Sequence, residues 1–162
     1  MTKILAVFLM ALLLTGCGTE KTGDRDMARY ENYEFRVALQ FPAEWKPVEG
    51  YENRYGGENG YIQLAGIGGT DLQLEQVARD QTEHRLSPYG SSPEIVHPPD
   101  SALPALLILP SKDQDPEHEG LAALVVRLPE PVITPAGEYG FLIVWGDKGH
   151  IPQLAGTLEV LP

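Results

Sequence analysis

The stretch "YEFRVALQF", residues 33–41, decides the fold class, because its large apolar residues alternate with polar or small ones. A period of two is typical of a β-strand with one buried face. Pro42 would end this strand, and Trp45 is expected to pack as a plug at the end of a sheet rather than to stack on a ligand. The folded part of the chain is therefore predicted to begin with a strand over residues 33–41.

A β-hairpin is predicted at Asn59-Gly60, because both central residues of a type I′ turn need a positive φ. Pairing Glu58 with Tyr61 across this turn places Tyr51 and Tyr55 on the face of the core. A longer turn would instead leave these two tyrosines as an aromatic ligand cage. With the short turn, the polar side chains of the hairpin share the wetter face with Tyr61: Glu52, Arg54 and Gln63.

A helix is predicted from Thr70, whose hydroxyl can cap the first turn while Gln73 reaches back in a capping-box arrangement. Three apolar residues at helical spacing follow, and they would form the buried stripe of this helix: Leu74, Val77 and Ala78.

Three nearly continuous apolar runs are predicted to be strands, either central ones covered on both faces or ones with a sheet face buried under helices: residues 103–109, 121–128 and 139–145. Shorter elements are predicted around them. These are an edge strand over 94–97, a loop with a brief strand over 130–138, a two-turn helix with Pro152 in its first turn, and a last short strand. The pattern predicts an α+β fold, built on an antiparallel sheet flanked by helices, in a single domain.

The first residues predict an export signal. Lys3 gives a short basic start, and residues 4–14 are apolar. A membrane-spanning helix needs about 20 apolar residues, so this run is too short for a permanent anchor and suits a cleaved signal. Cleavage after Gly16 would make residues 1–16 the signal peptide.

The one cysteine of the chain, Cys17, follows this run directly. Leu14-Thr15-Gly16-Cys17 resembles the lipobox of bacterial lipoproteins. The resemblance implies that Cys17 carries membrane lipid and that the protein lies, lipid-anchored, on the extracytoplasmic face of a bacterial membrane. Two or three acyl chains suffice as an anchor, at about 0.8 kcal/mol per buried methylene. The alternative is an ordinary secretory signal with an incidental cysteine.

Residues 17–32 are mostly charged or small, and we predict that they form a flexible tether with a reach of roughly 20 Å. Residues 33–162 would then form the globular domain, which we expect to be a monomer. The chain carries 12 Lys and Arg against 23 Asp and Glu, a net charge of −11. Nucleic acid and anionic headgroups would repel such a domain, so nucleic acid is not expected as a partner and the acyl chains alone would hold the domain at the membrane.

The order of the predicted elements resembles the PsbP-like sandwich. The residues that carry the resemblance are Phe41-Pro42-x-x-Trp45, the helix at residues 74–78 and the terminal unit over residues 151–160. The resemblance covers residues 33–162 and implies an α/β/α arrangement, with an antiparallel sheet between helices. The metal and photosystem contacts of the photosynthetic members do not carry over, because no matching residues occur here. A shared fold does not assign a function.

The common catalytic motifs are absent from the sequence, which has no Gly-rich phosphate loop, no His-Glu-x-x-His and no Gly-x-Ser-x-Gly. The acidic stretch over residues 112–120 is a weak metal candidate, with His118 among its four carboxylates: Asp113, Asp115, Glu117 and Glu119. It fails as an EF-hand, because His118 stands at the required turn glycine and Leu124 at the bidentate glutamate. We expect a solvated loop that binds calcium weakly or not at all, and no cofactor.

Asp80 and His84, one turn apart on the predicted helix, could form a catalytic or metal-binding pair, but their charged neighbours favour a solvated helical face. We therefore expect a non-catalytic lipoprotein that binds an envelope or integral membrane protein. The alternatives are an envelope hydrolase that uses Asp80, His84 or the acidic loop, and a lipoprotein that binds a small ligand or a metal. A concave pocket with convergent polar groups would favour an alternative.

Overall fold

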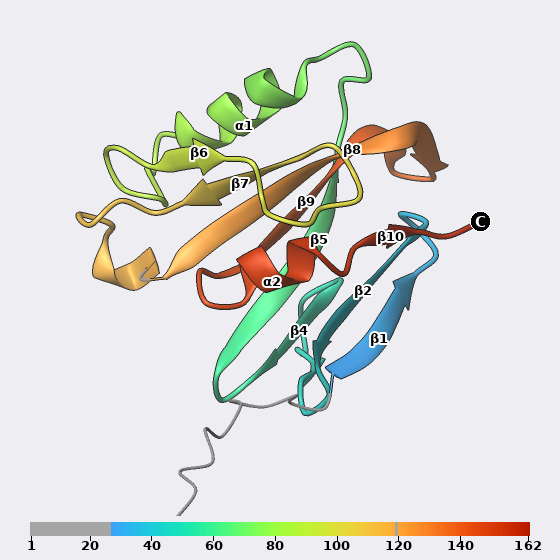
Figure 1. Cartoon of the computed structure of the whole chain (residues 1–162), viewed down its shortest axis with the longest axis horizontal. Coiled ribbons are helices and arrows are strands. Elements are labelled where there is room, and N and C mark those ends of the chain that lie inside the picture. The colour runs from blue at the N-terminus through green and yellow to red at the C-terminus, as the bar shows by residue number, and fades with distance from the viewer. Residues whose placement is uncertain (1–26, 119) are drawn as a thin grey trace, which may run out of the picture.

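The computed structural model describes residues 27–118 and 120–162, and most of them form antiparallel β-sheet (Figure 1). A small sheet has the strand order β1-β2-β10: β1 (Met27–Asn32), β2 (Val37–Pro42) and β10 (Glu159–Val160). A large sheet has the order β3-β4-β5-β9-β8-β7-β6: β3 (Lys46–Pro47), β4 (Arg54–Gly57), β5 (Gly60–Ile67), β9 (Gly137–Asp147), β8 (Leu121–Thr134), β7 (Ala105–Leu109) and β6 (Glu94–Val96). The helices are α1 (Leu74–Thr82), α2 (Ile151–Ala155) and the 3₁₀ helix η1 (Pro116–His118).

A different layer covers each face of the large sheet (Figure 1). α1 packs on β7 and β8 and buries the predicted stripe of Leu74, Val77 and Ala78. The small sheet and α2 pack on the other face, around a second core that includes residues of β5, β7, β8 and β9. Alternate residues of β8 enter the two cores in turn: Ala122, Leu124 and Val126 enter one, and Ala123 and Val125 the other.

The predicted α+β class with an antiparallel sheet is therefore confirmed, as are central strands covered on both faces. The flanking layers agree with the prediction only in part, because strands outweigh helices on the α2 side. The short elements near the C-terminus lie where the sequence predicts them. Pro152 falls in the first turn of α2, and β10 follows.

The folded part begins earlier than predicted. Residues 27–32, assigned from the sequence to the tether, form β1 and pair with all six residues of β2. Tyr30 faces the core from β1, with its ring centroid 4.6 Å from that of Tyr55 and 5.7 Å from that of Phe41. Burial raises the pKa of Tyr30 to about 12. Cys17, the rest of the predicted tether and the signal over residues 1–16 lie outside the described residues.

The predicted strand over residues 33–41 is wrong in its first half, which forms a turn. The Asn32 side chain accepts a hydrogen bond from the Phe35 N–H at 2.9 Å, an Asx-type turn, and Arg36 has a φ of 53°. Tyr33 is consequently 76% exposed, whereas Phe35 is buried as the alternation predicts. The strand itself starts only at Val37.

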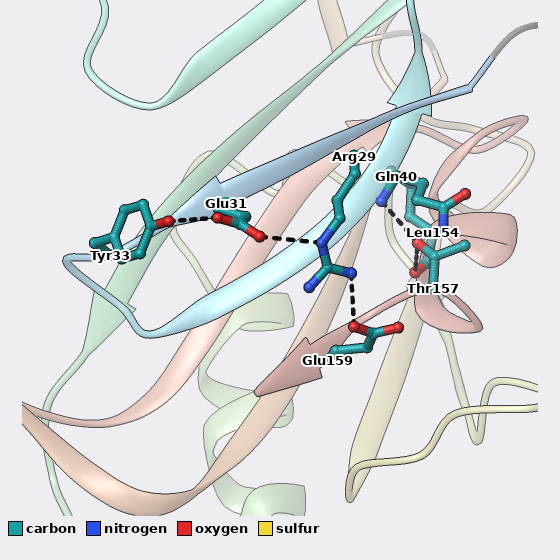
Figure 2. Close-up of polar contacts among 7 residues, drawn as sticks. All are labelled: Arg29, Glu31, Tyr33, Gln40, Leu154, Thr157 and Glu159. Atoms are coloured by element: carbon teal, nitrogen blue, oxygen red, sulfur yellow. Dashed lines mark hydrogen bonds and ion pairs between the residues drawn. The ribbon is translucent and has the colours of Figure 1, made fainter. Parts of the chain in front are cut away.

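A polar network on the outer face of the small sheet ties the first strand to the last (Figure 2). Arg29 donates to Glu31 at 3.2 Å and to Glu159 at 2.6 Å, and the Tyr33 hydroxyl donates to the other oxygen of Glu31. Glu31 and Glu159 both pair with Ala38 of β2, so the network lies across Ala38, which is fully buried. A small outward-facing residue is thus protected by charged neighbours.

The predicted hairpin forms, but its register differs. Gly57 pairs with Gly60, so Glu58 and Asn59 are the loop residues instead of Asn59 and Gly60. Gly60 has a φ of 146°, and a Cβ there would overlap the Asp147 carboxylate. The Asn59 side chain accepts a hydrogen bond from the Trp45 indole N–H at 2.8 Å, and Trp45 is buried, as predicted for a plug.

The first long helix starts at Leu74, four residues after the predicted start at Thr70, and its N-cap residue, Gln73, makes no side-chain cap. The reason is a long-range contact. Arg127 of β8 donates to the backbone carbonyls of Leu72 at 2.8 Å and Thr70 at 3.4 Å. These bonds hold the segment in a turn, in which the Leu72 N–H donates to the Gly69 carbonyl at 2.9 Å, and the tertiary contact thereby overrides the local capping signal.

Candidate functional site

A break in the pairing of β8 with β9 creates the candidate site. The ladder stops after Arg127 and resumes at Val132, so residues 128–131 lie opposite Gly140 alone. The segment contains two prolines, which lack the N–H that a ladder bond needs. It therefore bulges out of the sheet, at the predicted end of the strand over 121–128 and the start of the predicted loop over 130–138.

A cavity of about 250 Å³ opens beside this bulge, and we call it the bulge cavity. Its walls come from the bulge, from the turn before β2 and from β10. Arg36 and Glu130 contribute the charged groups, and both are exposed. The remaining lining residues are apolar: Phe35, Leu128, Pro129, Val132 and Val160.

The wall of the bulge cavity includes an exposed apolar residue, Val160, which is 42% exposed. Ile133, the neighbour of Val132 in β8, is 82% exposed but points to the opposite face of the hairpin. In Figure 1 the hairpin of β8 and β9, the turn before β2 and the C-terminus gather at one end of the fold. Met27 lies at the opposite end of β1 from that turn, about 17 Å away for a six-residue strand.

The acidic loop of the sequence is used for local hydrogen bonds. Asp113 accepts from the Ser111 hydroxyl and from the Ser91 N–H, and these bonds lower its pKa to about 2. Asp115 accepts from the Glu117 N–H at 2.8 Å, at the start of η1. Across residues 27–118 and 120–162, no three His, Cys, Asp or Glu side chains converge in a way that could hold a metal ion. Glu119 lies outside the described residues.

Asp80 and His84 do not share a helical face as predicted, because α1 ends at Thr82. Asp80 accepts a long hydrogen bond from Gln76, and the His84 ring accepts one from the Leu86 N–H. Both residues are exposed.

An Asp–His pair that sequence reasoning missed lies at the far end of β9. His150 Nδ1 is 2.8 Å from Oδ1 of Asp147, and the imidazole packs edge-on against Trp45, with ring centroids 4.9 Å apart. A carboxylate and the imidazole that it orients supply two of the three members of a catalytic triad. In the described part of the chain, no hydroxyl or thiol nucleophile is hydrogen-bonded to His150. The spacing of three residues between Asp147 and His150 was the available sequence signal.

Only one of the two tyrosines predicted for the core lies there. Tyr55 packs in the core beside Phe41, whereas Tyr51 is 54% exposed and lies over the guanidinium of Arg54. Tyr61 contacts the same guanidinium from β5. Arg54 and Tyr61 therefore share a face, as the sequence predicts, and Tyr51 joins them there.

The chain is similar in structure to a solved protein, although its sequence matches none of the known families. No protein-family model matches the chain, and no curated protein matches its sequence. The chain is similar to the solution structure of a cyanobacterial PsbP from Synechocystis sp. PCC 6803, with 12% identity and a TM-score of 0.41, over 91% of this chain and 98% of that one. In the described ranges, no helix has the length and apolar character needed to span a bilayer.

Proposed function

We propose that this protein is a lipoprotein held by Cys17 on the extracytoplasmic face of a bacterial membrane, where it binds a partner protein of the cell envelope without catalysing a reaction. The anchor part of the proposal rests on the sequence Leu14-Thr15-Gly16-Cys17. The partner-binding part rests on one structural observation, the bulge cavity with its largely apolar lining and the exposed Val160 in its wall.

The size and lining of the bulge cavity favour a protein side chain as the occupant. Small-molecule sites usually measure about 300–1,000 Å³ and hold several convergent polar groups. This cavity is smaller, about 250 Å³, and its charged groups are limited to the exposed Arg36 and Glu130. An apolar centre within a polar rim is typical of protein–protein interfaces. An apolar side chain of the partner fits this chemistry better than a soluble metabolite does.

The chain length between the anchor and the fold supports an outward-facing cavity. Nine residues separate Cys17 from Met27, so the two Cα atoms can be at most about 36 Å apart in any conformation. The start of β1 must therefore stay near the membrane once Cys17 is lipidated. The bulge cavity lies at the other end of β1, which leaves it accessible to an envelope protein.

The anchor is tested by substituting Cys17 with serine. We expect Cys17→Ser to stay folded and to leave the membrane fraction, because a serine hydroxyl cannot receive the thioether-linked lipid and the burial of two or three acyl chains is lost. Mass spectrometry of the wild-type N-terminal peptide should find diacylglyceryl on Cys17. An unmodified Cys17, or a chain processed elsewhere, would contradict the anchor.

Partner binding is tested by chemical crosslinking in intact cells. The lipidated protein should recover one dominant envelope protein, and Cys17→Ser should recover much less, since confinement to the membrane raises the effective concentration of the partner. Recovery of no specific protein, together with turnover of a substrate by the soluble chain, would instead favour the hydrolase alternative.

A further inference from the structure

Arg54 is held by two tyrosine rings from different parts of the chain. Its guanidinium carbon lies 4.4 Å from the ring centroid of Tyr51, in the loop before β4, and 4.2 Å from that of Tyr61, in β5. Both distances are well within the roughly 6 Å at which a guanidinium interacts with an aromatic face. We call these three residues the tyrosine–arginine site.

The guanidinium of Arg54 keeps its hydrogen-bonding capacity. Within the described ranges, the ion pairs are those of Arg29 and His150, and no side-chain hydrogen bond of Arg54 is present. Contact with an aromatic face engages the charge of a guanidinium but leaves its five N–H donors available for hydrogen bonds. Burial raises the pKa of Tyr61, the charge of Arg54 lowers it and that of Asp147 raises it, and Asp147 is itself bonded to His150. Arg54 is therefore an oriented cation without a carboxylate partner in the described chain.

The surface around Arg54 is open to a ligand. A depression of about 450 Å³ has Arg54 and both tyrosines in its wall, and three glycines form much of the rest: Gly56, Gly57 and Gly60. Lys46, Gly56 and Tyr61 pair in one row across β3, β4 and β5, so Lys46 adds a second positive charge to the same face.

The helix that covers this side of the large sheet does not reach the site. α1 packs on β7 and β8, whereas β9 and β5 lie between β8 and β4 in the strand order. At about 4.8 Å per strand, β4 is roughly 14 Å from β8. Arg54, Tyr61 and Gln63 are accordingly only half-buried.

We propose that the tyrosine–arginine site binds a carboxylate of an acidic segment in a partner polypeptide. A carboxylate matches the planar fork of a guanidinium and can accept two parallel hydrogen bonds from it. Tyrosine and arginine are the residue types that contribute most to protein interfaces. Anionic lipid is the less favoured source of a negative group, because the net charge of −11 repels an anionic surface. The site is independent of the bulge cavity and of the anchor.

Nuclear magnetic resonance of the full chain in detergent micelles tests this site directly. The probes are the peptide acetyl-Ala-Glu-Ala-amide and its neutral counterpart acetyl-Ala-Gln-Ala-amide. We expect the glutamate peptide to shift the Arg54 Nε–H resonance saturably and the glutamine peptide to leave it unchanged. An equal response to both peptides, or none to either, would overturn the proposal.

Variants separate recognition from general charge. Arg54→Gln should lower the affinity for the glutamate peptide by about tenfold or more, because losing a charge-assisted hydrogen bond usually has an effect of this size. Arg85→Gln, an exposed arginine in the turn after α1, is the matched control and should bind as the wild type does. Unchanged affinity in Arg54→Gln would overturn the proposal. If that variant does not fold, the resonance of wild-type Arg54 decides alone. Vesicles of phosphatidylglycerol are the last probe. If they shift the Arg54 Nε–H resonance and the peptide does not, the site binds lipid and the proposal is overturned.

Discussion

Arg29 and Glu159 are separated by 130 positions in the sequence, yet Nη1 of the arginine lies 2.6 Å from Oε2 of the glutamate. The pair links the first strand to a residue three positions before the C-terminus, across β2 (Figure 2). Both side chains are well exposed, so we assign them a role in covering Ala38 rather than a large electrostatic contribution. The relationship identifies β1 as part of the folded domain.

A chain that begins at residue 33 should therefore be much less stable than one that begins at residue 27. The shorter chain loses the pairing of β1 with β2, the buried Asn32 and the half-buried ring of Tyr30. Loss of a fully buried aromatic side chain typically costs about 3–5 kcal/mol, and we expect the strand pairing, Asn32 and the half-buried ring together to lower the free energy of unfolding by about that much. Urea denaturation of the two chains measures the difference. Equal midpoints would show that residues 27–32 belong to the tether after all.

Replacing Asn32 by alanine should destabilise the protein by about 1–3 kcal/mol, the cost of leaving buried partners unsatisfied. Asn32 is 4% exposed, donates to Asn53 at 2.9 Å and accepts from the Phe35 N–H. Glu49→Ala, in an exposed loop, is the control and should change the stability little. A wild-type denaturation midpoint for Asn32→Ala would contradict the Asx-type turn that ends β1.

Gly60→Ala should cost more stability than Gly50→Ala, although both glycines have a positive φ. A Cβ at Gly50 meets nothing within 4 Å, whereas at Gly60 it would overlap the Asp147 carboxylate. Both alanines carry a backbone cost, at a φ of 83° for residue 50 and 146° for residue 60, and Gly60→Ala carries an additional cost of about 1–3 kcal/mol for overpacking. Denaturation of both variants side by side measures the difference. Equal losses would mean that the hairpin tip and Asp147 are not in contact.

The stability difference between the wild type and Asp113→Asn should depend on pH. Hydrogen bonds from Ser111 and Ser91 lower the pKa of Asp113 from 3.8 to about 2, so the fold favours the ionised carboxylate. The stabilisation is fully present above about pH 4 and is lost as the pH falls from there toward 2. Unfolding measured at several pH values should show the two proteins converging in acid, and Ser111→Ala should show a smaller pH dependence. A constant difference from pH 6 to pH 2 would be inconsistent with this assignment.

The sequence predicts the elements better than it predicts their ends. The alternation of Val37, Leu39 and Phe41 is confirmed as a buried strand face. The strand over residues 27–32 was missed, because two of its three outward residues are charged and its inward residues are a small one, a tyrosine and a buried asparagine. Such a strand forms because it pairs with β2, and its own sequence does not show that pairing.

Long-range contacts explain the other differences. The helix start moved from Thr70 to Leu74 because Arg127, more than 50 residues away, binds the intervening backbone. The hairpin register differs from the predicted one because Gly60 ends the loop instead of lying inside it. A glycine is needed there because its φ is positive and because the Asp147 carboxylate fills the place of a Cβ. The bulge cavity was absent from the prediction, although the two prolines of residues 128–131 are a local signal for a break in pairing.

The central claim, that a partner docks at the bulge cavity, is tested most directly by site-specific photocrosslinking in intact cells. A photoreactive residue at Val160, in the cavity wall, should capture one dominant envelope protein. The same residue at Val96, on the edge strand β6, is a matched control, because the two valines are 42% and 38% exposed. The account predicts capture from position 160 that disappears when Glu130 and Pro129 are both replaced by lysine, and no such product from position 96. Equal products from both positions, or none from position 160, would contradict it.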